Sequence, residues 1–227
     1  MHLSIRLKIL DKLYAIYDEY VGNLDVACRK NCAHCCTCNV ILTTLEGYKI
    51  VDHLESHGIW NWLQAIESVS YKKRFQPKTT TNKIAECCMH GRHLPEEEIQ
   101  STGGACPFLK KDQCTLYGVR PFGCRCMVSR RNCNETGFAE IDEFVATVNT
   151  VFLQVIEHLD WQGCSGNLTD ILQCLATKEN RSAYRSDSLA CLKWALIPNQ
   201  KMTVLMIPPE HRKQIEPIVQ DLRSITF

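Results

Sequence analysis

The chain has 227 residues, of which 45% are hydrophobic, and a formal net charge of +1. A chain of this length can bury a full hydrophobic core, so its 15 cysteines are not expected to form the disulfide framework of a small secreted domain. The balanced charge gives no overall attraction to nucleic acid or to a membrane surface. Charged residues interrupt the N-terminal segment, which predicts no signal peptide, and no stretch suits a membrane span. We therefore expect a cytoplasmic protein with reduced thiols.

Regular spacing of apolar residues predicts several helices in the first half of the chain. Apolar residues recur every three or four positions over residues 3–21, which indicates an amphipathic helix. Thr43 and Glu46 have the spacing of a capping box, and the helix that they begin is expected to continue to about His57. Further helices are expected over residues 60–69 and 84–89, and another beginning at Pro95.

The second half contains the clearest helical pattern, from about Ile141 to Leu159. Shorter helices over 168–176 and 189–196, a strand over 202–207 and a closing helix after Pro209 are expected to follow. These patterns predict a mostly α fold, a compact helical domain with irregular cysteine-rich metal-binding loops and at most one or two short strands. We expect a single domain over residues 1–227, with a cysteine-cluster region at 28–126 and a helical C-terminal part at 138–227.

Five cysteines fall within eleven residues, beginning at Cys28. The spacing of Cys28, Cys32 and Cys35 lets three thiolates turn toward one point, as in a [4Fe–4S] cluster or a zinc tetrahedron. Polar residues between these cysteines argue against simple burial in a core. A fourth ligand must come from elsewhere in the chain, and the candidates are Cys106, Cys114, Cys124 and Cys126. One hypothesis is that Cys124 completes the site of the first three thiols.

Other residues near this pattern receive other interpretations. Adjacent side chains of an extended chain point in opposed directions, so Cys35 and Cys36 are not expected to bind the same ion. His34 is interpreted as a solvent-facing residue or as a hydrogen-bond donor to a metal ligand. Glu46 is interpreted as a helix cap that could also bind the metal or one of its ligands. Cysteines without a partner at ligand spacing are expected to be buried or idle thiols: Cys87, Cys88, Cys164, Cys174 and Cys191.

The order of these residues resembles the YkgJ-type cysteine-cluster family, whose CxxCxxCC domain is described as zinc- or iron-chelating. The first half of the match is Cys32-Ala-His-Cys35-Cys36, followed by Thr43 and Glu46. The second half is Cys106-Pro-Phe-Leu, Cys114-Thr-Leu-Tyr117, Arg120-Pro121 and Cys124-Arg125. The resemblance spans about residues 28–126, so the C-terminal hundred residues lie outside it.

The resemblance implies a zinc or iron site built from the cysteines that match the family pattern. These metal-site candidates are Cys28, Cys32, Cys35, Cys36, Cys106, Cys114 and Cys124. The layout is also distantly similar to flagellin lysine N-methylases, which implies protein methylation with S-adenosylmethionine as an alternative activity. Three further cysteines have no counterpart in the pattern: Cys38, Cys126 and Cys133.

Seven thiolates exceed the four ligands of one zinc ion, which favours a cluster or two metals. We therefore favour a metal-binding protein with an iron–sulfur cluster, [4Fe–4S], used structurally or with a redox or protein partner. Zinc in a structural or interaction protein is the first alternative, and a methylase is the second. The pair Gly103-Gly104 is only weak support for a nucleotide pocket. The cysteine spacing also occurs in radical S-adenosylmethionine enzymes, but the barrel-like βα alternation is missing. Neither nucleic acid nor a membrane is expected as a partner, and enzymatic activity is left open.

Overall fold

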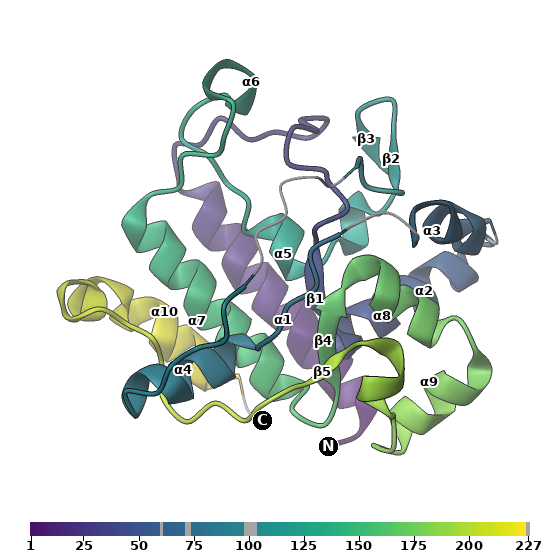
Figure 1. Ribbon diagram of the computed structural model, residues 1–227. Helices are drawn as coiled ribbons and strands as arrows, with labels where there is room; N and C mark the ends of the chain where they lie inside the picture. Colours follow the sequence, from purple (N-terminus) through teal and green to yellow (C-terminus); the bar gives the residue numbers. More distant parts are fainter. Residues whose placement is uncertain (60, 71–73, 98–103, 226–227) are drawn as a thin grey trace.

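The computed structural model describes residues 1–59, 61–70, 74–97 and 104–225, and its helices surround one hydrophobic core (Figure 1). Helix α1 (Leu3–Gly22) packs against α7 (Glu143–Leu159), and α2 (Thr44–Ser56) packs against α8 (Leu168–Leu175). Helix α3 (Trp62–Ser70) contacts α8, and α4 (Thr81–Met89) contacts α7. The remaining helices are α5 (Phe122–Arg125), α6 (Cys133–Thr136), α9 (Lys178–Arg185), α10 (Arg212–Ser224) and the 3-10 turns η1 (Tyr117–Val119), η2 (Cys191–Trp194) and η3 (Pro209–His211). The mostly α fold class is confirmed.

Local signals explain where the principal helices begin. The predicted capping box forms at α2, since the Thr43 side chain accepts a hydrogen bond from the Glu46 amide while the Glu46 carboxylate accepts one from the Thr43 amide. Asp142 caps α7 by accepting from the amide of Phe144. Both helices then bury the apolar face that the periodicity predicted.

The strands are short and form two small antiparallel sheets. The first has the order β1-β4-β5, in which β4 (Cys164–Asn167) lies between β1 (Ile41–Thr43) and β5 (Ile197–Pro198). The second is a hairpin of β2 (Leu109–Lys110) and β3 (Gln113–Cys114). Strand β1 leads directly into α2, so the first sheet connects the core to the cysteine-rich segment that precedes it.

The strand expected over residues 202–207 is absent, and side chains of α7 explain why. The Gln154 side chain donates to the carbonyl of Val204 and accepts from the amide of Met206, and His158 accepts from the amide of Met202. These side chains satisfy backbone groups that a partner strand would otherwise bind. The segment is therefore extended along a helix instead of forming a strand in a sheet.

Some other expected elements differ in extent. Residues 189–196 form only the 3-10 turn η2 instead of an α-helix. The helix expected from Pro95 is not seen over residues 95–97, and its continuation over 98–103 lies outside the described residues. The helix predicted over residues 60–69 is observed as α3, and residue 60 also lies outside the described residues. Helix α9, which was not predicted, begins at a Thr177 cap.

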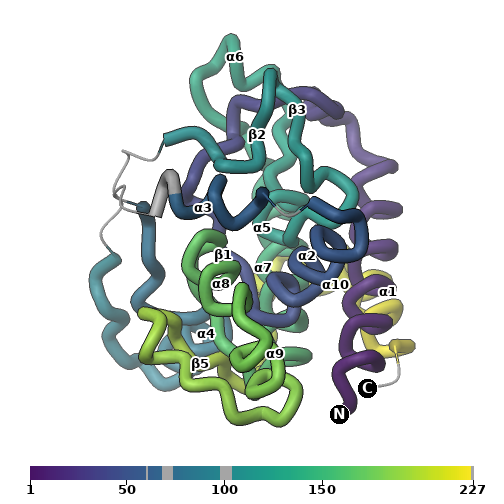
Figure 2. Tube along the Cα trace, turned by 90° about the vertical axis from the view of Figure 1, so that its right-hand side faces the viewer, coloured from purple at the N-terminus to yellow at the C-terminus, as the bar shows by residue number. Residues whose placement is uncertain are grey.

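The cysteine-rich segments gather at one end of the molecule. Two views at right angles place α6, the β2–β3 hairpin and the loop after α1 at the end opposite both chain termini (Figures 1 and 2). These segments are far apart in the sequence, so the helices below them determine which cysteines meet.

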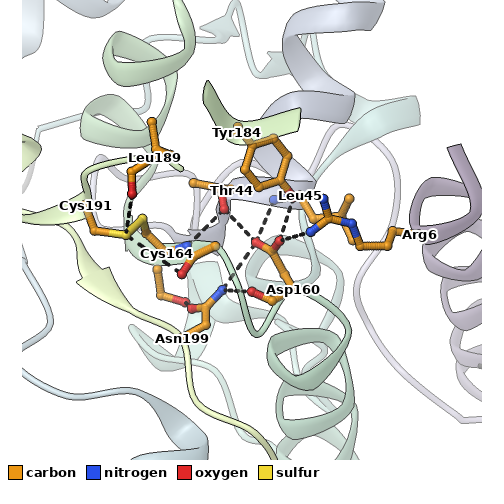
Figure 3. Close-up of a disulfide and its surroundings, with 11 residues drawn as sticks. Arg6, Thr44, Leu45, Asp160, Cys164, Tyr184, Leu189, Cys191 and Asn199 are labelled. Atoms are coloured by element: carbon orange, nitrogen blue, oxygen red, sulfur yellow. Dashed lines mark hydrogen bonds and ion pairs between the residues drawn. A yellow bond between two sulfur atoms is a disulfide. The ribbon is translucent and has the colours of Figure 1, made fainter. Parts of the chain in front are cut away.

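The other end contains a disulfide and a buried ion pair (Figure 3). Cys164 of β4 is bonded to Cys191 of η2, so the interpretation of these two residues as free core thiols is wrong. The neighbouring Asp160 carboxylate is fully buried and accepts from Arg6, Thr44 and Tyr184 side chains. Cys174 is a buried thiol as expected, whereas Cys88 is exposed.

Candidate metal centre

Three segments build the cysteine-rich site: the loop of residues 24–40, the β2–β3 hairpin and the short helix α5. Backbone hydrogen bonds join the first two, since the Cys106 amide donates to the Cys36 carbonyl at 3.0 Å and the Cys38 amide donates to the Gly104 carbonyl at 2.9 Å. An isolated antiparallel bridge lies between these bonds. The loop is thereby held in register against the start of the hairpin.

The hairpin brings Cys114 back toward Cys106. Leu109 pairs with Cys114, and the Leu109 amide donates to the Cys106 carbonyl at 3.0 Å. Lys111 and Asp112 form the turn, and both adopt positive φ values of 48° and 61°. This left-handed pair has the twist that a two-residue hairpin requires.

Helix α5 carries Cys124 against the first sheet. A Cβ atom added at Gly123 would lie 2.7 Å from the carbonyl oxygen of Ile41, so only glycine permits this close approach of α5 to β1. The buried Glu46 carboxylate accepts from the Phe122 amide at 2.7 Å and from the Tyr14 hydroxyl at 2.8 Å. Glu46 therefore acts as a helix cap that also positions α5, and its oxygens are engaged in these bonds.

The site encloses a cavity of about 780 Å³. All seven candidates from the sequence line it, together with one cysteine that the pattern did not include: Cys28, Cys32, Cys35, Cys36, Cys106, Cys114, Cys124 and Cys126. The structure thus brings the local group and the remote group of thiols around a common space. Within the described ranges, however, no three His, Cys, Asp or Glu side chains are arranged so that they could hold a metal ion as they stand.

Burial favours the neutral form of several of these thiols. Burial, and after it the charge of neighbouring thiolates, raises the pKa of Cys106 and of Cys35 to about 11. The pKa of Cys124 is raised more strongly, by burial first and then by Cys106, Cys114 and Cys36. Ionising several thiols together is therefore unfavourable unless a cation compensates their charge.

Two arginines on the α5 side have different roles. Arg125 donates to both carboxylate oxygens of Asp18, at 3.0 and 2.8 Å, and to the carbonyls of Arg120 and Gly118, so its charge is paired. Arg120 lines the cavity, and its guanidinium lies 4.1 Å from the centre of the Tyr117 ring. Among the described residues the buried Nε of Arg120 has no hydrogen-bond partner. Arg120 is thus a cation on the cavity wall, beside Arg29 and Arg125.

No known family model, characterised protein or solved structure matches this chain. The resemblance to the YkgJ-type family therefore stays a prediction. In the described part of the chain, none of the helices has the length and apolar character that crossing a membrane requires.

The histidines near the pattern do not join the cavity lining. His34 is exposed, and its Nε2 lies 3.3 Å from the carbonyl oxygen of Gly137 at the end of α6. The rings of His53 and His57, at the end of α2, have centres 4.1 Å apart and planes inclined at 37°, and neither residue lines the cavity.

The cavity lining also includes apolar residues, which the cysteine pattern alone did not predict. They are Val40 and Ile41 around β1, Phe75, Ile84 of α4 and Leu153 of α7. Apolar residues near the thiols limit the access of water and lower the local dielectric constant. Hydrophobic periodicity assigned Leu153 and Ile84 to helices, but it contained no signal for their position at this site.

Proposed function

We propose that this chain is an iron–sulfur protein whose cysteine thiolates hold [4Fe–4S] cluster iron in the cavity of about 780 Å³. The observation that carries the proposal is the convergence of eight free thiols from three separate segments on one partly apolar space. Free cysteine is commonly a buried hydrophobic residue, but thiols of a simple core do not line a cavity.

The chemistry of the donors supports an iron–sulfur cluster. Thiolates are soft ligands, which such clusters and zinc both prefer. The number of thiols exceeds the four that one zinc ion takes. Arg120, whose Nε is buried without a partner among the described residues, would offset the negative charge of a thiolate-rich cluster.

Binding requires the thiols to turn inward from their positions in the described structure. Several of these thiols belong to irregular loop, which can adjust more readily than a packed helix. Metal binding would release the protons that burial keeps on Cys35, Cys106 and Cys124, because a bound cation stabilises the thiolate form. Loop ordering and metal binding are therefore expected to be coupled.

We also propose a reducing, cytoplasmic location and a redox or protein partner. Thirteen of the cysteines are free, and free thiols in such number persist where cellular reductants maintain them. The Cys164–Cys191 disulfide lies in the core away from the cavity, where Cys164 is fully buried.

The test is the iron, zinc and acid-labile sulfide content of protein purified without oxygen, together with its visible spectrum. Brown protein with equal amounts of iron and sulfide supports the proposal. Colourless protein that contains zinc and no sulfide would overturn it in favour of a structural zinc site. Cys174→Ser is the matched control, since Cys174 is buried in α8 and does not line the cavity, and it should retain the metal content of the unmodified protein.

A further inference from the structure

We infer that the cysteines form two metal centres, one held by Cys36, Cys106, Cys114 and Cys124 and the other by Cys28, Cys32, Cys35 and Cys133. This inference rests on the proposed function, since it assigns the thiols of the same region to separate clusters. It differs from the simplest interpretation of the sequence, in which Cys124 completes the site of Cys28, Cys32 and Cys35.

The first group follows from the register of the backbone. A backbone hydrogen bond joins the segments of Cys36 and Cys106, and the hairpin returns Cys114 beside them. Helix α5 approaches β1 closely at Gly123, which places the next residue, Cys124, on the same wall.

The second group lies where the cysteine loop meets the segment after α5. The Ser129 amide donates to Sγ of Cys28 at 3.2 Å, and the Ala27 amide donates to the Ser129 carbonyl at 2.8 Å. His34, at the other side of the loop, lies within hydrogen-bond distance of the Gly137 carbonyl. Cys133 is located between these two attachment points.

Cys133 is a better fourth ligand than Cys126 for this group. It is 5% exposed and follows Ser129, whose amide donates to Sγ of Cys28, by four residues. The Cys126 thiol instead donates to the Gly123 carbonyl of α5. Cys126 is therefore engaged with α5 and not with the segment that meets Cys28.

The adjacent pair Cys35 and Cys36 divides the two groups. The Cys36 carbonyl accepts from the Cys106 amide, whereas Cys35 shares the close spacing of Cys28 and Cys32. Neighbouring side chains of a non-helical segment point in different directions, so two adjacent cysteines can bind different centres. Two-cluster ferredoxins likewise use one cysteine-rich run for both of their clusters.

The experiment compares metal and sulfide content in Cys114→Ser, Cys32→Ser and the double variant, with far-UV circular dichroism as the check on folding. Two centres predict eight irons and eight sulfides per chain, about half of that in each single variant, and none in the double variant. Reduced protein should show a spin-coupled electron paramagnetic resonance spectrum that becomes a simple one in either single variant. Cys174→Ser should change none of these values.

Four irons per chain, all lost in both single variants, would overturn the division into two centres while leaving the proposed function intact. Protein that contains only zinc would instead overturn the proposed function. In that case two zinc ions, one lost in each variant, would still support the division, and a single zinc ion would refute it. Cys133→Ser should lower the content to the level of Cys32→Ser while Cys126→Ser should not, and the reverse result would overturn the assignment of Cys133.

Discussion

Glu46→Gln tests whether one buried carboxylate connects the helical core to the cysteine site. The two oxygens of Glu46 accept four hydrogen bonds, from the Tyr14 hydroxyl, the Phe122 amide, and the amide and hydroxyl of Thr43. Glutamine has the same shape but replaces one oxygen with a donor group. Whichever way the amide turns, it faces one hydroxyl, which can accept, and one backbone amide, which cannot.

The substitution therefore leaves one buried backbone amide opposite another donor, which costs about 1–3 kcal/mol. We expect a loss of about 2 kcal/mol in the free energy of unfolding, measured by urea denaturation of the metal-free protein with circular dichroism as the signal. We also expect weaker metal retention, because the Phe122 amide fixes the start of α5 and Cys124 follows two residues later.

Glu55→Gln is the matched control on the same helix. Glu55 is 36% exposed and pairs with Arg181 at 3.0 Å, so its neutralisation should cost less than about 1 kcal/mol. Equal stability of the two variants, within about 0.5 kcal/mol of the unmodified protein, would refute the role assigned to Glu46.

Three further predictions concern other buried groups. Asp160→Asn should destabilise the protein by about 3–5 kcal/mol in urea denaturation, because it leaves the buried guanidinium of Arg6 without its fully buried anion. Raising the pKa of Cys35 from 9.0 to about 11 lowers its thiolate fraction at pH 8 about a hundredfold. When metal-free protein is treated with iodoacetamide, mass spectrometry should therefore detect modification of the exposed Cys88 long before that of Cys35. The modification rate of Cys35 should rise about tenfold per pH unit. Cys191→Ser should lower the unfolding free energy of the oxidised protein by about 3–4 kcal/mol, since the disulfide closes a separation of 27 residues, and should remove any effect of added reductant.

Sequence reasoning succeeded where the signal was local. The capping box at Thr43 and the apolar face of α7 are each encoded within a few turns of helix, and both elements begin and end close to their predicted limits. It failed for residues 202–207, whose apolar pattern suits a strand, because the side chains of Gln154 and His158 bind its backbone instead. Periodicity contains no information about such a distant partner.

The cysteine site shows the same division between local and distant information. Spacing grouped Cys28, Cys32 and Cys35, and the structure places them along one cavity. Spacing contained no means of pairing Cys164 with Cys191, because that bond depends on how β4 and η2 meet. The position of Cys126 on the cavity wall likewise depends on α5 approaching the first sheet.

The two ends of the molecule are stabilised in different ways. The end that contains the termini has helices, a three-stranded sheet, a disulfide and the buried pair of Arg6 and Asp160. The cysteine end has two-residue strands and short helical turns. Under the proposed function, bonds between thiolates and a metal would give these irregular segments a further source of order. The helical end would then fix which thiols meet, and metal binding would fix how closely they converge.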